Sequence, residues 1–114
     1  GGKPEVEVVD VKVEPPVIGL GEKITLSFTV KSTVESSQRL VIDYAIDYVK
    51  SAGHSAAKVF KLKAFTLGAG ERQSIRREQH IRELTTRKHY PGRHAVHVLV
   101  NGERLGSAEF ELRD

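Results

Sequence analysis

The chain has 114 residues, with 18 Lys and Arg, 15 Asp and Glu and a formal net charge of +3. This length and composition predict one small soluble domain and exclude a second domain. The absence of cysteine excludes disulfides, thiolate nucleophiles and sulfur-ligated zinc. No apolar run approaches the roughly 18 residues of a spanning helix, so we expect neither a membrane segment nor a signal peptide.

The amount of apolar material and the chain start bear on domain organisation. Val, Ile, Leu and Phe contribute 33 residues, enough for one hydrophobic core. The chain contains no Met and begins with Gly1 and Gly2. We therefore interpret residues 1–2 as a tag remnant and residues 3–114 as a single domain, a fragment of a larger protein.

Charge is distributed unevenly along the chain. Residues 1–57 carry 6 basic and 8 acidic side chains, whereas residues 58–114 carry 12 and 7, so the halves have net charges of −2 and +5. An excess of this size can attract an anionic partner, but it is milder than that of a dedicated nucleic-acid-binding domain.

Alternation of apolar and polar residues predicts a series of β-strands. The first carries a bulge near Val8 and Val9, where the apolar residues change parity, and the parity of the fourth changes again at Phe65. Arg72 to Glu83 has too few apolar residues for an amphipathic helix, so we predict an edge strand there. In chain order, the predicted strands cover residues 6–13, 24–31, 40–49, 58–67, 72–83, 94–100 and 108–112.

Turn residues separate these strands. Pro15 and Pro16 end the first, because proline cannot donate to a strand ladder. Asn101 followed by Gly102 is the strongest hairpin signal in the chain. Further turns are predicted at residues 19–21, 51–53, 68–70 and 91–92. About seven short strands in this length indicate an all-β fold, an immunoglobulin-like or fibronectin-like antiparallel β-sandwich, with a small closed barrel as the alternative.

Residues able to support catalysis or bind metal form no recognisable constellation. Asp43 and Asp47 lie on one strand face about 13 Å apart, too far for a glycosidase carboxyl pair. The odd spacing of His94 and His97 directs their rings to opposite faces, so we expect no metal site and interpret His94 as a buried structural histidine. No nucleophile elbow and no three-glycine phosphate loop occur. We expect a non-catalytic domain without a cofactor.

The remaining functional signal is a basic run of seven cations in the 22 residues from Arg72 to Arg93. Arg76 and Arg82 share strand parity, whereas Arg77 has the opposite parity. The run is interpreted as a nucleic-acid-binding surface, and the alternative is an ordinary solvated edge with ion pairs worth about 0–1 kcal/mol each. The candidate nucleic-acid-binding residues are Arg76, Arg77, Arg82, Arg87, Lys88 and Arg93.

Two stretches resemble a known family. These are LVIDYAIDYVKSAGHSAAKVFKLKAFTL, which begins at Leu40, and TTRKHYPGRHAVHVLVNG, which ends at Gly102. They resemble the C-terminal immunoglobulin-like β-sandwich domain of bacterial DNA alkylation repair proteins of the HEAT-like repeat type. The resemblance extends from about Leu20 to Leu112, and its most specific parts are V-I-D-Y-A, K-V-F-K-L-K, and Y-P-G-R-H followed by V-N-G.

The resemblance implies a cytoplasmic parent whose helical repeats grip DNA and excise alkylated bases. It implies that this chain is the non-catalytic tail domain of that parent, but it does not supply the role of the tail. From the resemblance together with the net charge of +5 in residues 58–114, we expect an accessory domain that assists DNA binding or docking, with the duplex DNA backbone or the helical repeats of the same chain as partner. The alternative is a protein-interaction or structural module without DNA contact, using an apolar patch of Val41, Ala45 and Val49. The fragment is expected to be monomeric. Tyr90 would act like the tyrosine corner of sandwiches, and the structural residues are Tyr90, Gly92, His94, Asn101 and Gly102.

Overall fold

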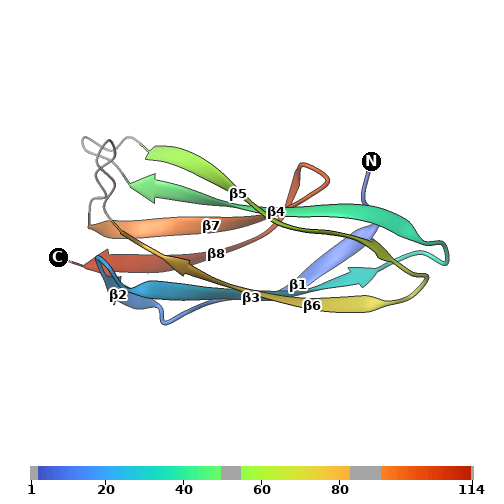
Figure 1. The fold of residues 1–114 in the computed structure, drawn as a ribbon, viewed down its shortest axis with the longest axis horizontal. Coiled ribbons are helices and arrows are strands. Elements are labelled where there is room, and N and C mark those ends of the chain that lie inside the picture. The colour runs from blue at the N-terminus through green and yellow to red at the C-terminus, as the bar shows by residue number, and fades with distance from the viewer. Residues whose placement is uncertain (1–2, 50–54, 83–90, 114) are drawn as a thin grey trace.

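The computed structural model describes residues 3–49, 55–82 and 91–113. Within these ranges, eight β-strands form two layers, with β4, β5 and β7 above β3 and β6 in Figure 1. Within the described residues, no helix has the length and apolarity needed to cross a bilayer. The strands are β1 Val6–Glu14, β2 Val17–Gly19, β3 Lys23–Ser32, β4 Gln38–Val49, β5 Ser55–Leu67, β6 Arg72–His80, β7 Gly92–Val100 and β8 Glu103–Arg113.

The strands pair into a three-stranded sheet in the order β1-β3-β6 and a five-stranded sheet in the order β2-β8-β7-β4-β5. All pairs are antiparallel except β2 with β8, which is parallel. The predicted sandwich is confirmed, and the closed barrel is excluded because the two sheets are separate. β2 was not predicted from the sequence, since its three residues are too few to show alternation.

The core forms where the alternating apolar residues of the two sheets face each other. In β3, Ile24, Leu26, Phe28 and Val30 are at most 2% exposed, and the intervening residues face outward. In β7, the core positions are His94, Val96, Val98 and Val100, each 0% exposed. The alternation identified in the sequence therefore reports burial directly.

Two register shifts explain the changes of parity in the sequence. In β1, the register shifts between Val9 and Lys12, and Asp10 within this bulge has a φ of 56°. Between β4 and β5, the register shifts at Ile42 and Asp43, so Phe60 and Phe65 face the same side despite their odd spacing. The β1 bulge lies close to Val8 and Val9, where the sequence predicts it, and the shift between β4 and β5 accounts for the change of parity noted at Phe65.

The two lateral sides of the sandwich differ. On one side β1 packs closely against β8, and a Cβ atom added to Gly106 would lie 2.8 Å from Cγ2 of Val11. On the other side, β5 and β6 are each an edge strand, and neither pairs with a further strand among the described residues. The sandwich is thus closed by apolar packing at β1 and β8, whereas its β5 and β6 side presents two strand edges.

Candidate nucleic-acid interface

The predicted basic residues separate in the structure. Arg76 and Arg77 lie on β6, Arg82 follows that strand, and Arg93 lies near the start of β7. The two remaining basic candidates, Arg87 and Lys88, lie outside the described residues, as does the predicted structural residue Tyr90. β6 is an edge strand, as predicted.

Arg76 and Arg93 lie on opposite faces of the molecule. Arg76 pairs in register with the outward-facing Ser27, so it belongs to the outer face of the three-stranded sheet. Arg93 adjoins the buried His94 and faces outward from the five-stranded sheet, where its Nη1 lies 3.3 Å from Oε1 of Glu109. The predicted set therefore does not form one surface.

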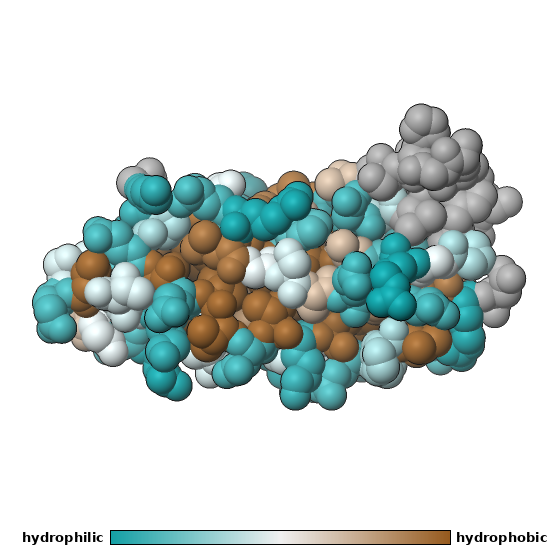
Figure 2. Space-filling view, turned by 180° about the vertical axis from the view of Figure 1, so that it is seen from behind, coloured by the Kyte–Doolittle hydropathy of each residue, from teal (hydrophilic) through white to brown (hydrophobic). Residues whose placement is uncertain are grey.

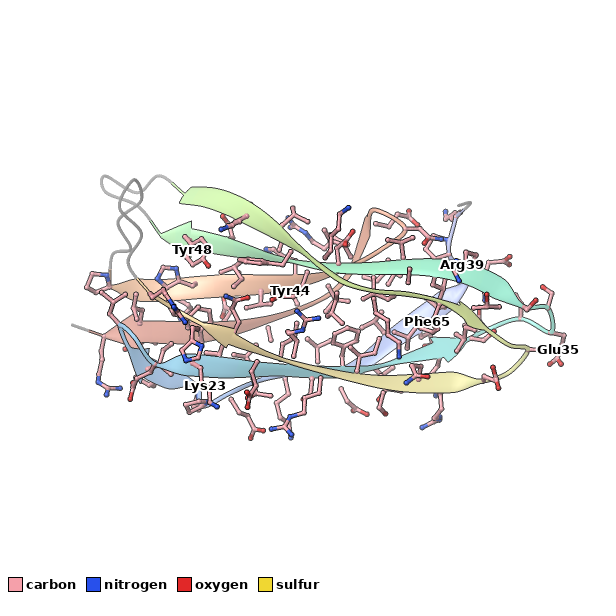
Figure 3. All side chains as sticks on the ribbon, viewed as in Figure 1. Lys23, Glu35, Arg39, Tyr44, Tyr48 and Phe65 are labelled. Carbon is pink, nitrogen blue, oxygen red and sulfur yellow. The ribbon has the colours of Figure 1, made fainter. Side chains whose placement is uncertain are left out.

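Arg77 points between the sheets. Its register partner Leu26 is buried, and its Nη2 donates to the carbonyl of Leu62 on β5 over 3.3 Å. Beside it, the hydroxyl of Tyr44 donates to Oε1 of Gln79 over 2.5 Å. Figure 3 shows Tyr44 between the two layers. Burial raises the pKa of Tyr44, and the charge of Arg77 partly offsets this increase.

The lysines of β5 lie along the same side of the sandwich as β6. Lys58 and Lys63 follow the inward parity of Phe60 and Phe65, whereas Lys61 is paired with the outward-facing Asp43. All three lysines are exposed. Sequence reasoning missed them because they are 13 or more residues from Arg76 and join it only through the packing of the two sheets. We define the basic edge as Lys58, Lys61, Lys63, Arg72, Arg76 and Arg77.

Charge is polarised across the sandwich. β5 and β6 together carry six cations and one carboxylate, that of Glu78, for a net charge of +5. Glu78 pairs with Lys23 of β3 at 3.2 Å. On the opposite side, β1, β2 and β8 together carry three cations and six carboxylates, a net charge of −3. A dipole of this kind orients an approaching polyanion toward the basic edge.

Aromatic rings support the lysines of this edge. Nζ of Lys58 lies 5.2 Å from the ring centroid of Phe60, and Nζ of Lys63 lies 5.2 Å from that of Phe65. Phe60 in turn stacks on Tyr44 with centroids 5.0 Å apart. The rings fill the space between the sheets, while the ammonium groups stay in water above them.

The described residues of the predicted structural set lie in the core, in the last hairpin and at the start of β7. His94 stacks on Phe110 with ring centroids 5.3 Å apart, inside the core. Asn101 and Gly102 have φ angles of 49° and 83°, as a type I′ hairpin requires. Oδ1 of Asn101 also accepts a hydrogen bond from the backbone N–H of Val41 over 2.8 Å, which joins the hairpin to β4. Gly92 has a φ of 138° at the start of β7.

His97 occupies the outer face of the five-stranded sheet but is only 8% exposed. Its Nδ1 lies 2.7 Å from Oγ of Ser107. Burial lowers the pKa of His97, the nearby Arg104 lowers it further, and Asp47 opposes both. No group of three or more His, Asp or Glu side chains within the described ranges could hold a metal ion.

Apolar side chains are exposed on two surfaces. On the outer face of β4 and β5, Val41 is 43% and Val59 is 58% exposed, but Ala45 is 6% exposed, so its predicted place in an open patch is wrong. Its neighbours across the sheet cover its small side chain. The side chain of Val49 lies outside the described residues. Figure 2, the view from behind Figure 1, shows an apolar band. We use this name for the partly buried apolar residues of β1 and β8, which are Val6, Val8, Val11, Leu105 and Ala108.

Comparison with known protein families shows which family the domain belongs to. The family model for the C-terminal Ig-like domain of the uncharacterised protein YhaZ matches residues 7–114. The chain belongs to this family. YhaZ of Bacillus subtilis (strain 168) is 37% identical over 107 residues, which cover 94% of this chain and 29% of that protein.

Solved structures connect the family to DNA repair. The alkylpurine DNA glycosylase AlkC of Pseudomonas fluorescens, bound to DNA containing an abasic site analog, is 73% identical over the whole of this chain, with a TM-score of 0.97. The match covers 32% of AlkC, so the chain spans about a third of the length of these relatives. The expected resemblance to DNA alkylation repair proteins is confirmed. A Listeria innocua β-glucosidase, 22% identical over 100% of this chain and 17% of its own with a TM-score of 0.74, shares the fold alone.

Proposed function

We propose that this domain is a non-catalytic accessory domain of a DNA alkylation repair glycosylase, and that its basic edge contacts the phosphates of duplex DNA. The similarity to a DNA-bound alkylpurine DNA glycosylase, at 73% identity, carries this proposal. The polarised charge of the sandwich supports it, because lysine and arginine side chains that neutralise phosphates supply most of non-specific DNA affinity.

The basic edge has free cations for this role. Within the described part of the chain, the three lysines of β5 and Arg72 and Arg76 of β6 form no ion pair with a carboxylate. By contrast, Arg93 and Arg113 are paired with Glu109 and Glu22. Unpaired cations meet a phosphate without first breaking an existing ion pair.

Binding of a fluorescently labelled duplex of about 20 base pairs, measured by anisotropy, tests the proposal. About three phosphate contacts would weaken binding roughly 40-fold between 50 and 200 mM salt. The triple variant Lys61→Glu, Lys63→Glu, Arg72→Glu should abolish binding.

A matched variant separates position from total charge. The variant Arg93→Glu, Arg104→Glu, Arg113→Glu makes the same change in net charge on exposed residues outside the basic edge. It should retain most of the affinity. Equal loss in both variants would show that net charge alone attracts DNA, and absence of binding by the unmodified domain at the lower salt would contradict the proposal.

The apolar band beside β1 and β8 favours a second candidate function, docking onto the remaining two-thirds of such a glycosylase. Its residues lie on β1 and β8, which together with β2 carry a net charge of −3, and this charge disfavours DNA and suits a protein partner. Amide chemical shifts of β1 and β8 should move when that remaining part is added. Shifts confined to β5 and β6 would contradict this docking surface.

A further inference from the structure

A groove crosses the outer face of the three-stranded sheet, on the side of that sheet away from the core. It has a volume of about 350 Å³ and passes over the middle of all three strands. Its polar lining comes from β1, β3 and β6 and consists of Asp10, Lys12, Ser27, Thr29, Ser74 and Arg76.

The groove exists because the central strand presents small side chains outward. The core-facing residues of β3 are large and apolar, whereas Ser27 and Thr29 between them are small and each carries a hydroxyl group. Oγ1 of Thr29 lies 3.1 Å from Oγ of Ser74 on β6. The floor of the groove is therefore a row of hydroxyl groups that can each donate or accept a hydrogen bond.

One row across the sheet places a serine between two cations, with one cation on each neighbouring strand. Lys12 of β1 and Arg76 of β6 are both in register with Ser27 of β3. Adjacent strands lie about 4.8 Å apart, so the backbones of the two cations are separated by about 10 Å. This separation allows both side chains to reach one anion seated above Ser27.

Neither cation is neutralised by the protein. Within the described residues, Lys12 and Arg76 form no ion pair, although Lys23 on the same sheet pairs with Glu78 at 3.2 Å. Asp10 lines the groove, and the bulge with its φ of 56° places it beside the row, but it makes no ion pair with either cation. Its carboxylate opposes an anion in the groove and so limits the affinity.

From these contacts, we infer that the row of Lys12, Ser27 and Arg76 is a binding site for a phosphate group. An arginine can bind two phosphate oxygens, the serine hydroxyl can donate to a third, and Lys12 supplies a point charge. The phosphate comes either from the DNA backbone or from free phosphate. Only the choice of DNA as a source rests on the proposed function.

Titration of the isotope-labelled domain with inorganic phosphate tests the site by amide chemical shifts. We expect saturable shifts at millimolar phosphate for Ser27 and its neighbours on β1 and β6. Arg76→Ala should weaken binding more than tenfold, since it removes charge-assisted hydrogen bonds. Lys12→Ala should weaken it about threefold, and Asp10→Asn should strengthen it about threefold, because each changes one charge near the phosphate.

Lys23→Ala is the matched control, because Lys23 is on the same outer face but is paired with Glu78. It should leave phosphate affinity within about twofold of the original value. The gain from Asp10→Asn is the sharpest result, since general damage to the fold cannot strengthen binding. Absence of saturable shifts, or shifts that Lys12→Ala and Arg76→Ala leave unchanged, would overturn the inference.

A second titration distinguishes the two sources of phosphate. If duplex DNA shifts the same amides and inorganic phosphate displaces it, the site takes a backbone phosphate. If inorganic phosphate alone shifts them, the site takes free phosphate. Lys12→Ala leaves the basic edge intact, and Lys61→Glu with Lys63→Glu leaves the groove intact, so failure of this site and failure of the proposed function can be told apart.

Discussion

The hydroxyl of Tyr44 on β4 and the side-chain carbonyl of Gln79 on β6 are 2.5 Å apart and join the two sheets on their open side. Arg77 adds a second link there through the carbonyl of Leu62. On the opposite side, Val8 and Val11 pack around Gly106. Polar contacts thus connect the sheets at one lateral side and apolar contacts connect them at the other.

Tyr44→Phe should lower the free energy of unfolding by about 1 kcal/mol, because it removes the inter-sheet hydrogen bond and keeps the ring. It should also alter the alkaline pH dependence. Since burial raises the pKa of Tyr44, the unfolded chain ionises first, and the domain loses stability as pH rises above about 10. Urea denaturation of both proteins across this range should show the smaller loss in the variant. An identical pH dependence would contradict this account.

Stability should fall on the acid side through His97. Because its pKa is lowered in the fold, the unfolded chain takes up a proton first, so stability is complete above about pH 6.5 and declines as pH falls through the lowered value. His97→Gln should flatten the decline measured by thermal unfolding between pH 7 and 5. The same change at His80, which is exposed on β6, provides the control. Equal flattening by both changes would refute the assignment to His97.

Gly106→Ala should destabilise the domain by about 1–3 kcal/mol. The added Cβ would lie 2.8 Å from Val11 and 3.1 Å from Val8, and these short, branched side chains cannot turn away without disturbing the core. Gly19→Ala is the comparison, because its nearest neighbour would be at an ordinary 3.4 Å. Chemical denaturation should show a change within about 0.5 kcal/mol for Gly19→Ala. An equally small change at Gly106 would show that β1 can move away from β8.

Asn101 combines a backbone role with a side-chain role, and two substitutions separate them. Asn101→Gly keeps the positive φ of 49° and removes the hydrogen bond from Val41, so we expect a loss of about 1 kcal/mol. Asn101→Ala also places a Cβ in the left-handed region, which adds about 1–2 kcal/mol. Denaturation curves of the two variants measure this difference. Equal losses would mean that the turn relaxes to another conformation.

The sequence predicts the fold more completely than it predicts the candidate site. Period-two alternation placed the core residues of β3 and β7 correctly, and Asn101 with Gly102 predicted the last hairpin, because these signals depend on neighbours within one strand. The basic edge depends on the packing of β5 beside β6, which no local spacing reports. Sequence reasoning therefore grouped Arg93 with Arg76 by proximity in the chain and overlooked Lys61.

The groove was missed for a related reason. Lys12 is 64 residues from Arg76 in the chain, and only the pairing of both strands with β3 brings them into one row. A one-residue change in the β1 bulge would turn Lys12 toward the core. Prediction of such a row needs strand order and register, and the sequence patterns gave neither.

The long unpaired edge of β5 has a consequence for the behaviour of the protein in concentrated solution. A strand of 13 residues with free backbone groups is a template for pairing with another copy, and its three lysines make two such edges repel each other. The same lysines would meet DNA phosphates in the proposed function. Neutral side chains at these positions would remove the repulsion, so the variant Lys58→Ala, Lys61→Ala, Lys63→Ala should pair with a second copy along β5, as a doubling of the mass of the domain in sedimentation would report.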